Sequence, residues 1–158
     1  IAVNDLLVVE IPLEFKFELW KQKFKLFSDF AVNARGEERA RNAGRPDKTD
    51  AVYAYQVGLG LGEAKKKGQW AVKGFWQHTD LYALDPNLVD SDIFDTKLNM
   101  EGFVLNGKYN FTDFLTGSVT YAIADRADGG LPTTVTGEIG VNPLGEYHLL
   151  QCDLSWKF

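Results

Sequence analysis

The chain has 158 residues, of which 45% are apolar and 25% are charged, with one cysteine and a formal net charge of −5. This length is sufficient for one domain, so residues 1–158 are expected to form a single domain or part of one. The mildly negative net charge argues against a nucleic-acid partner, and a single cysteine excludes an internal disulfide framework. No apolar run approaches the roughly 18 residues of a membrane-spanning helix, whereas a membrane β-barrel stays compatible with the composition.

Apolar residues recur with a period of two along most of the chain, and this alternation predicts β-strands. Between Glu10 and Leu19, for example, one phase is entirely apolar and the other is mostly charged. The seven strands expected on this basis are, in chain order, Glu10–Leu19, Lys25–Asn33, Tyr53–Gly62, Trp70–Gln77, Phe103–Phe111, Leu115–Ala124 and Leu150–Phe158.

Short and long connections alternate between these strands. The short ones lie around Trp20–Lys23, Lys65–Gly68 and Asn110–Asp113, and the long ones cover roughly Arg35–Asp50, Thr79–Thr96 and Asp125–Glu146. Tight turns at one end and long loops at the other are typical of an antiparallel up-and-down transmembrane β-barrel. The predicted fold class is therefore all-β, with about seven strands visible.

The odd strand number is informative, because an up-and-down barrel that closes with antiparallel pairing needs an even number of strands. Either an eighth strand lies around Val135–Val141, or the chain is part of a larger barrel. We favour the second interpretation because Ile1–Asp5 has the composition of the end of a long loop.

Aromatic residues gather near both ends of the expected strands. Trp20, Phe24, Trp70, Phe111, Phe114, Trp156 and Phe158 lie beside the short turns or the chain end, whereas Tyr53, Trp76, Tyr82, Tyr121 and Tyr147 lie toward the long loops. Two such belts are typical of a protein surface that crosses both lipid interfaces. His78 and His148 share the phase of the apolar residues and are expected at the headgroup level. The alternative is a soluble extracytoplasmic β-barrel that binds an apolar ligand inside.

Several stretches resemble the C-terminal part of the barrel of bacterial outer-membrane porins. They are Ile11–Phe15, Phe27–Asn33, Met100–Asp113 and the ending Leu150–Phe158, in which the terminal Phe is similar to the assembly signal of such barrels. The resemblance implies a location in the bacterial outer membrane. Its implied partners are the lipid bilayer and either the remaining barrel strands or other porin subunits, with a homotrimer as one candidate assembly.

The polar phase of the strands is expected to face the lumen. The predicted pore-lining residues are Glu10, Glu14, Lys16, Glu18, Lys25, Asp29, Lys73, Gln77, Lys108, Gln151, Asp153 and Lys157. A lining with balanced charges predicts a water-filled pore for passive diffusion of small hydrophilic solutes and ions, with weak ion preference. In a narrow barrel the same side chains would instead form a salt-bridged plug, which would leave a pore-less membrane anchor or adhesin.

No catalytic, cofactor or metal site is predicted, and the chain is not expected to be an enzyme. The run Gly58–Gly62 lacks the following helix of a phosphate loop, and no His has the context of a nucleophilic triad. The acidic loop Asp85–Asp95 matches no calcium-loop spacing, so bound Ca²⁺ is left as an open alternative. The first loop is expected to pair its own charges at the surface, with Arg35, Arg39, Arg41 and Arg45 against Glu37, Glu38 and Asp47. The loop Asp125–Glu146 is long enough to fold into the pore.

Overall fold

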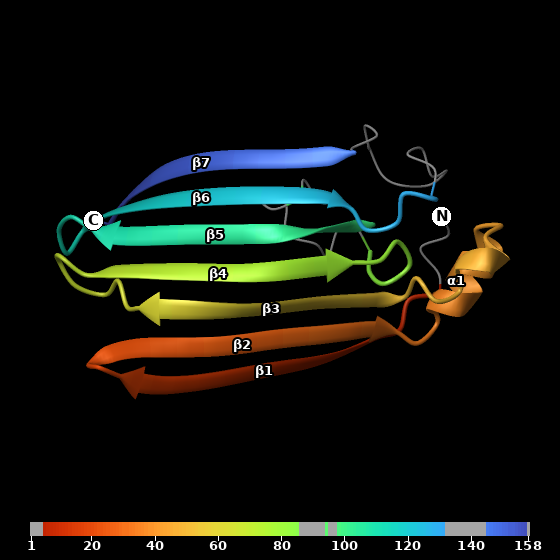
Figure 1. Cartoon of the computed structure of the whole chain (residues 1–158), viewed down its shortest axis with the longest axis horizontal. Coiled ribbons are helices and arrows are strands. Elements are labelled where there is room, and N and C mark those ends of the chain that lie inside the picture. Colours follow the sequence, from red (N-terminus) through yellow and green to blue (C-terminus); the bar gives the residue numbers. More distant parts are fainter. Residues whose placement is uncertain (1–4, 86–93, 95–97, 132–144, 158) are drawn as a thin grey trace.

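The computed structural model describes residues 5–85, 94, 98–131 and 145–157. Seven strands form one antiparallel sheet, and each strand pairs with the next one along the chain (Figure 1). They are β1 (Val8–Leu19), β2 (Gln22–Asn33), β3 (Tyr53–Gly62), β4 (Trp70–Thr79), β5 (Met100–Asn110), β6 (Leu115–Arg126) and β7 (Glu146–Trp156). The predicted all-β, up-and-down antiparallel architecture is confirmed.

The sheet has two edges in the described part of the chain, because β1 and β7 do not pair with each other. Pro12 lies in β1, which agrees with the confinement of proline to edge strands, where one donor fewer is tolerated. The segment Val135–Val141, where an eighth strand is one of the two sequence-based options, lies outside the described residues.

All short connections lie at one end of the sheet and the long ones lie at the other end (Figure 1). The tightest turn joins β1 to β2 through Trp20 and Lys21, whose φ angles of 51° and 61° are both positive. Positive φ at both central residues is the geometry of the type I′ turn, which matches the twist of a two-residue hairpin. The sequence-based turn at Trp20–Lys23 is therefore correct in place but shorter than expected.

The register divides the strand residues between two faces of the sheet. Every large apolar strand side chain that is exposed lies on one face, called here the apolar face; examples from neighbouring strands are Phe15, Leu26, Leu59, Val72, Leu105, Tyr121 and Leu150. The opposite face, called here the polar face, carries most of the charged strand residues. In a soluble antiparallel sheet, by contrast, the apolar face packs against the protein core and the charged face contacts water.

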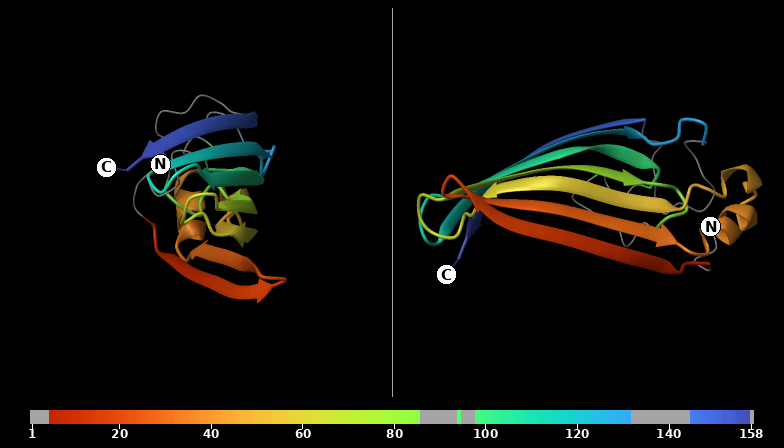
Figure 2. Two further views of the ribbon diagram at one scale, coloured as in Figure 1. Left: turned by 90° about the vertical axis from the view of Figure 1, so that its left-hand side faces the viewer. Right: turned by 60° about the horizontal axis from the view of Figure 1, so that its bottom comes forward.

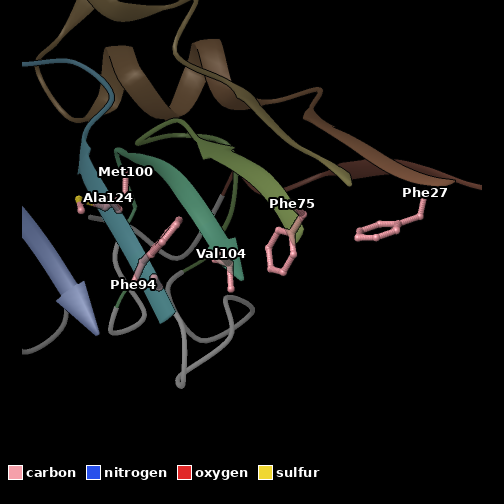
Figure 3. Close-up of a cluster of buried hydrophobic side chains, with 7 residues drawn as sticks. Phe27, Phe75, Phe94, Met100, Val104 and Ala124 are labelled. Carbon is pink, nitrogen blue, oxygen red and sulfur yellow. The ribbon is translucent and has the colours of Figure 1, made fainter. Parts of the chain in front are cut away.

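The sheet curves, and the space beside its polar face holds a small apolar cluster (Figures 2 and 3). The cluster contains Phe27, Phe75, Phe94, Met100, Val104, Ala122 and Ala124. Phe94 comes from the connection between β4 and β5, is fully buried, and packs edge-on against Tyr147 of β7 at 6.0 Å. A loop residue thus fills part of the volume that the polar face encloses.

A second apolar cluster lies among the long connections and contains Ala40, Val52, Leu81, Tyr82, Leu98 and Leu131. It packs against α1 (Gly36–Asn42), which is followed by the 3-10 helix η1 (Pro46–Lys48). The sequence pattern did not predict α1, because the helix has only 7 residues and its N-cap residue, Arg35, makes no capping side-chain hydrogen bond. Neither described helix has the length and hydropathy needed to cross a bilayer.

Candidate functional site

The register brings the predicted lining residues together on the polar face. All of them except Lys157, which directly follows β7, lie in strands and share this face. They form lateral rows across the strands. One row joins Asp29, Gln56 and Gln77, and another joins Lys16, Lys25 and Lys73 through Gly60. The two rows are separated by a row in which Phe27 and Phe75 flank Gly58.

An open cavity of about 630 Å³ lies over β1 to β4 near the long-loop end. Its polar lining includes Glu10, Asp29, Gln56, Lys73 and Gln77. Four of these five are predicted lining residues. Gln56 was not among the candidates, although the alternation along β3 places it in the same phase. The cavity therefore gathers part of the predicted site into one concave surface.

Two carboxylates lie side by side at the β1–β2 side of this cavity. Glu10 and Asp29 are close enough for their carboxyl groups to hydrogen-bond to each other. Within the described part of the chain, neither carboxylate has an ion-pair partner, and the Oδ1 atom of Asp29 is buried without a hydrogen-bond donor. A buried acceptor in this condition is energetically unfavourable unless a donor reaches it.

Lys73 and Phe75, which line the cavity, also contact the ring of Phe27. The rings of Phe27 and Phe75 meet edge-to-face at 6.1 Å. The Nζ atom of Lys73 lies 5.0 Å from the Phe27 ring centroid and 4.6 Å from that of Phe75, which is cation–π distance. Phe27 and Phe75 share the phase of the polar residues, but as apolar side chains they carry no sequence signal of a site.

Several other charges of the polar face near β1 and β2 pair with each other. Glu14 accepts from Lys16 at 2.6 Å and also pairs with Lys25. Closer to the short turns, Glu63 accepts from Lys23 at 2.6 Å and from Lys65 at 3.1 Å, and these partners hold the pKa of Glu63 below its ordinary value. These pairs are half-exposed and contribute little to stability individually.

Several sequence-based placements at the long-loop end are wrong. Tyr82 is fully buried in the loop cluster and Tyr147 packs against the cluster on the polar face, so neither belongs to an exposed aromatic belt. Phe94, from the β4–β5 connection, packs beside the polar face. That the Asp125–Glu146 loop folds into the pore stays a prediction. Most of that loop, together with Asp90, Asp92, Asp95 and Phe158, lies outside the described residues.

The first loop confirms the expected self-pairing only in part. Arg41 pairs with Glu37 at 2.6 Å and Arg45 pairs with Asp47 at 2.8 Å, and Arg45 lowers the pKa of Asp47 to about 2. Arg39, by contrast, is only 4% exposed and donates from Nη1 to the carbonyl oxygen of Leu84 at 2.7 Å. Burial lowers the pKa of Arg39, because a guanidinium ion is better solvated by water than by this packed environment.

The two histidines lie on the apolar face, in the phase expected for them. The ring of His78 stacks on Tyr55 at 4.9 Å, and its nitrogen atoms approach Glu101 at 2.9 Å and Asp80 at 3.0 Å. His148 approaches Glu146 at 2.7 Å. Polar groups therefore border the apolar face at its long-loop end.

Polar contacts join the three long connections to one another. The buried Asn33 side chain donates to the carbonyl oxygen of Tyr82 at 2.9 Å and accepts from the amide of Leu7 at 3.0 Å. Asp128, between β6 and β7, pairs with Lys48 of η1. Its amide donates to Oδ1 of Asn99 at 2.9 Å. These contacts cross-link the long connections into one layer at the end of the sheet.

The ion pair between Lys48 and Asp128 predicts a pH-dependent weakening of this layer. Lys48 holds the pKa of Asp128 below its ordinary value, and a carboxyl group with a lowered pKa stabilises the folded state above its unfolded pKa. That stabilisation is lost as the pH falls below about 4. Hydrogen exchange of the peptide that contains Ala127 and Asp128 is therefore expected to accelerate between pH 5 and 3 relative to the β5 and β6 strand amides.

An Asp128→Asn variant provides the control for this measurement. It is expected to exchange faster than the unsubstituted protein at neutral pH, and to lose most of the additional acceleration below pH 4. Equal acid sensitivity in both proteins would assign the effect to other carboxyl groups of the loops.

Within residues 5–85, 94, 98–131 and 145–157, no group of His, Cys, Asp and Glu side chains has the arrangement of a metal site. The single cysteine, Cys152, is exposed on the apolar face. No protein-family model, curated protein or solved structure matches this chain.

Proposed function

We propose that the protein is a bacterial outer-membrane porin, or the C-terminal part of one, that lets small hydrophilic solutes and ions diffuse through a water-filled pore. The observation that carries this proposal is the inverted distribution of side chains over the curved sheet. Large apolar side chains are exposed on the apolar face, whereas charged and amide side chains line the polar face, around which the sheet curves. Such an arrangement suits a barrel wall with lipid outside and water inside.

Aromatic contacts at the end with the short turns support the same proposal. Phe114 packs against Trp156 at 5.0 Å, Tyr109 meets Phe111 edge-on at 5.1 Å, and Trp20 is 84% exposed at the tip of the β1–β2 turn. At the other end, next to the long connections, the rings of Tyr53 and Phe30 pack with their centroids 5.9 Å apart. Aromatic side chains in both zones would anchor the wall at the two lipid interfaces.

Planar-bilayer recording on the purified full chain tests the proposal. Stepwise conductance that scales with salt concentration is the expected result. A protein that inserts into the bilayer without conducting would support the anchor or adhesin alternative. A monodisperse protein in water without detergent would instead support the soluble barrel, and both results would exclude a porin.

The double substitution Glu14→Lys and Glu18→Lys tests which face lines the pore. Both residues lie on the polar face in β1, and replacing their negative charges with positive ones is expected to shift the reversal potential in a salt gradient toward anion preference. The matched control is Glu37→Lys with Glu38→Lys, which makes the same change in net charge on the exposed part of α1. Equal shifts in the two variants would contradict the lining assignment.

A further inference from the structure

We propose that five lysines in and beside the β1–β2 and β3–β4 turns bind the anionic headgroups of the bilayer leaflet at the short-turn end of the sheet. Together they are called here the lysine surface: Lys21, Lys23, Lys65, Lys66 and Lys67. The inference goes beyond the proposed function, because it names a lipid partner instead of the solute that crosses the pore. It rests on that proposal only in placing the apolar face in a bilayer.

The two turns are neighbours at one end of the sheet. β2 pairs with β3, so the turn that precedes β2 lies beside the turn that follows β3 (Figure 1). The carboxylate of Glu63 joins them, because it pairs with Lys23 at the start of β2 at 2.6 Å and with Lys65 of the β3–β4 turn at 3.1 Å. The lysines of both turns therefore form one patch.

Hydrogen bonds fix the backbone that carries the lysines of the β3–β4 turn. The Oε1 atom of Gln69 accepts from the amides of Lys65 and Lys66, at 3.1 and 2.9 Å. The amide of Lys67 donates to Oδ1 of Asp113, in the β5–β6 turn, at 3.0 Å. The turn thus presents three consecutive lysines from an ordered backbone, and the donors that hold it are main-chain amides.

Positive charge exceeds negative charge on this surface. Within the described part of the chain, Lys21, Lys66 and Lys67 are exposed and take part in no ion pair. By register and contacts, three carboxylates lie nearest to the two turns, namely Glu18, Glu63 and Asp113. The five lysines outnumber them, although the chain as a whole carries a net charge of −5. The short-turn end is therefore a basic patch on an acidic chain.

Exposed aromatic rings lie at the same end as the lysines. Trp20, which directly precedes Lys21, is 84% exposed, and Trp70 is 43% exposed. Trp70 follows Lys67 by three residues, so at most about 10 Å of chain separates them. Exposed Trp side chains at the end of a membrane-spanning strand occupy the lipid interface, at the level of the headgroups. The lysine surface is therefore placed within reach of lipid phosphates.

An anionic bilayer surface engages both components of this patch. Its headgroups supply negative charge to the lysines, and its interfacial zone accommodates the aromatic rings. An acidic protein segment would pair with the lysines but would leave Trp20 without an apolar environment. Each lysine near an anionic leaflet strengthens attachment roughly fivefold, and salt weakens this attraction by screening. The combination of charge and aromatic rings therefore favours lipid as the partner.

Fluorescence quenching in reconstituted bilayers tests this inference on the full chain. The bilayers contain phosphatidylcholine that is brominated near the headgroup end of its acyl chains and quenches tryptophan, with increasing fractions of unbrominated phosphatidylglycerol. Every protein carries Trp76→Phe and Trp156→Phe, so that only Trp20 and Trp70 report. At low salt, phosphatidylglycerol is expected to bind roughly tenfold more tightly than phosphatidylcholine, and the preference is expected to decrease as salt is raised. Equal binding of the two lipids at low salt would overturn the inference.

Substitutions assign the preference to the unpaired lysines. The test variant combines Lys21→Gln, Lys66→Gln and Lys67→Gln, and its preference is expected to fall to within about twofold. The matched control removes three positive charges from the polar face: Lys16→Gln, Lys25→Gln and Lys108→Gln. A second control places arginine at the three test positions and so retains their charge. Loss of the preference in either control, or its retention in the test variant, would overturn the inference.

The lipid measurement and the conductance measurement have separate outcomes. Equal binding of the two lipids by a conducting protein would overturn the lysine surface and retain the porin. A preference for phosphatidylglycerol in a protein that does not conduct would retain the lysine surface and overturn the porin.

Discussion

Replacing Leu105 with arginine is expected to destabilise the protein in lipid vesicles by about 2–4 kcal/mol, the cost of an arginine on the lipid side of a barrel near the bilayer midplane. Leu105 lies in the middle of β5 on the apolar face, and its side chain is 42% exposed. At an exposed position of a soluble sheet, the same substitution would change stability by no more than about 0.5 kcal/mol. Equilibrium unfolding by guanidinium in the presence of vesicles measures the difference.

Ser118→Arg is the matched control for this substitution. Ser118 lies on β6, the strand beside β5, but on the polar face, where it is opposite Lys108 on one side and Asp153 on the other. An arginine there remains in water and gains a carboxylate neighbour, so its effect on the free energy of unfolding is expected to be small. Similar effects of the two substitutions would contradict a lipid environment for the apolar face.

The comparison of these two positions depends on strand phase, which was the most predictable feature of the molecule. The period-two alternation assigned Leu105 and Ser118 to opposite faces, and the register agrees. Phase is encoded locally, because successive side chains of a strand point to opposite faces whatever the distant partners are. The antiparallel order followed from the short turns, since tight hairpins leave no alternative neighbours for the strands that they join.

Contacts between segments far apart in the sequence could not be predicted. Phe94 lies in a stretch without alternation, and only the fold brings it against Tyr147 of β7. Arg39 belongs to a charge-rich run that is typical of a surface loop, yet the packing of α1 against the second loop buries it beside Leu84. In both places the determining interaction is tertiary, and neither local propensity nor charge pattern contains it.

The candidate site was predictable in composition but not in grouping. Alternation identified the charged residues of the polar face, whereas the cavity depends on which of them share lateral rows. A row requires the register of every strand pair that it crosses, and a one-residue slip would move each side chain to the other face. The row that holds Phe27, Gly58 and Phe75 could be recognised only after β2, β3 and β4 were placed side by side.

Replacing Gly58, at the centre of this row, with alanine is expected to lower the free energy of unfolding by about 2 kcal/mol. A Cβ atom at Gly58 would lie 2.4 Å from Cζ of Phe27, 2.5 Å from Cβ of Phe75 and 2.6 Å from the carbonyl oxygen of Gly74. The Phe27 ring can turn away, but Cβ of Phe75 and the backbone oxygen cannot move without shifting β4. The glycine is therefore required by the close approach of its neighbours.

Gly60→Ala is the control, because Gly60 lies in the same strand and on the same face. Its added Cβ would lie 3.5 Å from Cβ of Lys25, an ordinary contact, so the loss of glycine flexibility is expected to stabilise the protein by roughly 0.5 kcal/mol. Thermal unfolding of both variants in one detergent measures the opposite signs. If Gly58→Ala proved as harmless as Gly60→Ala, Phe27 and Phe75 would not pack closely over Gly58. The contact of Lys73 with both rings would then be contradicted as well.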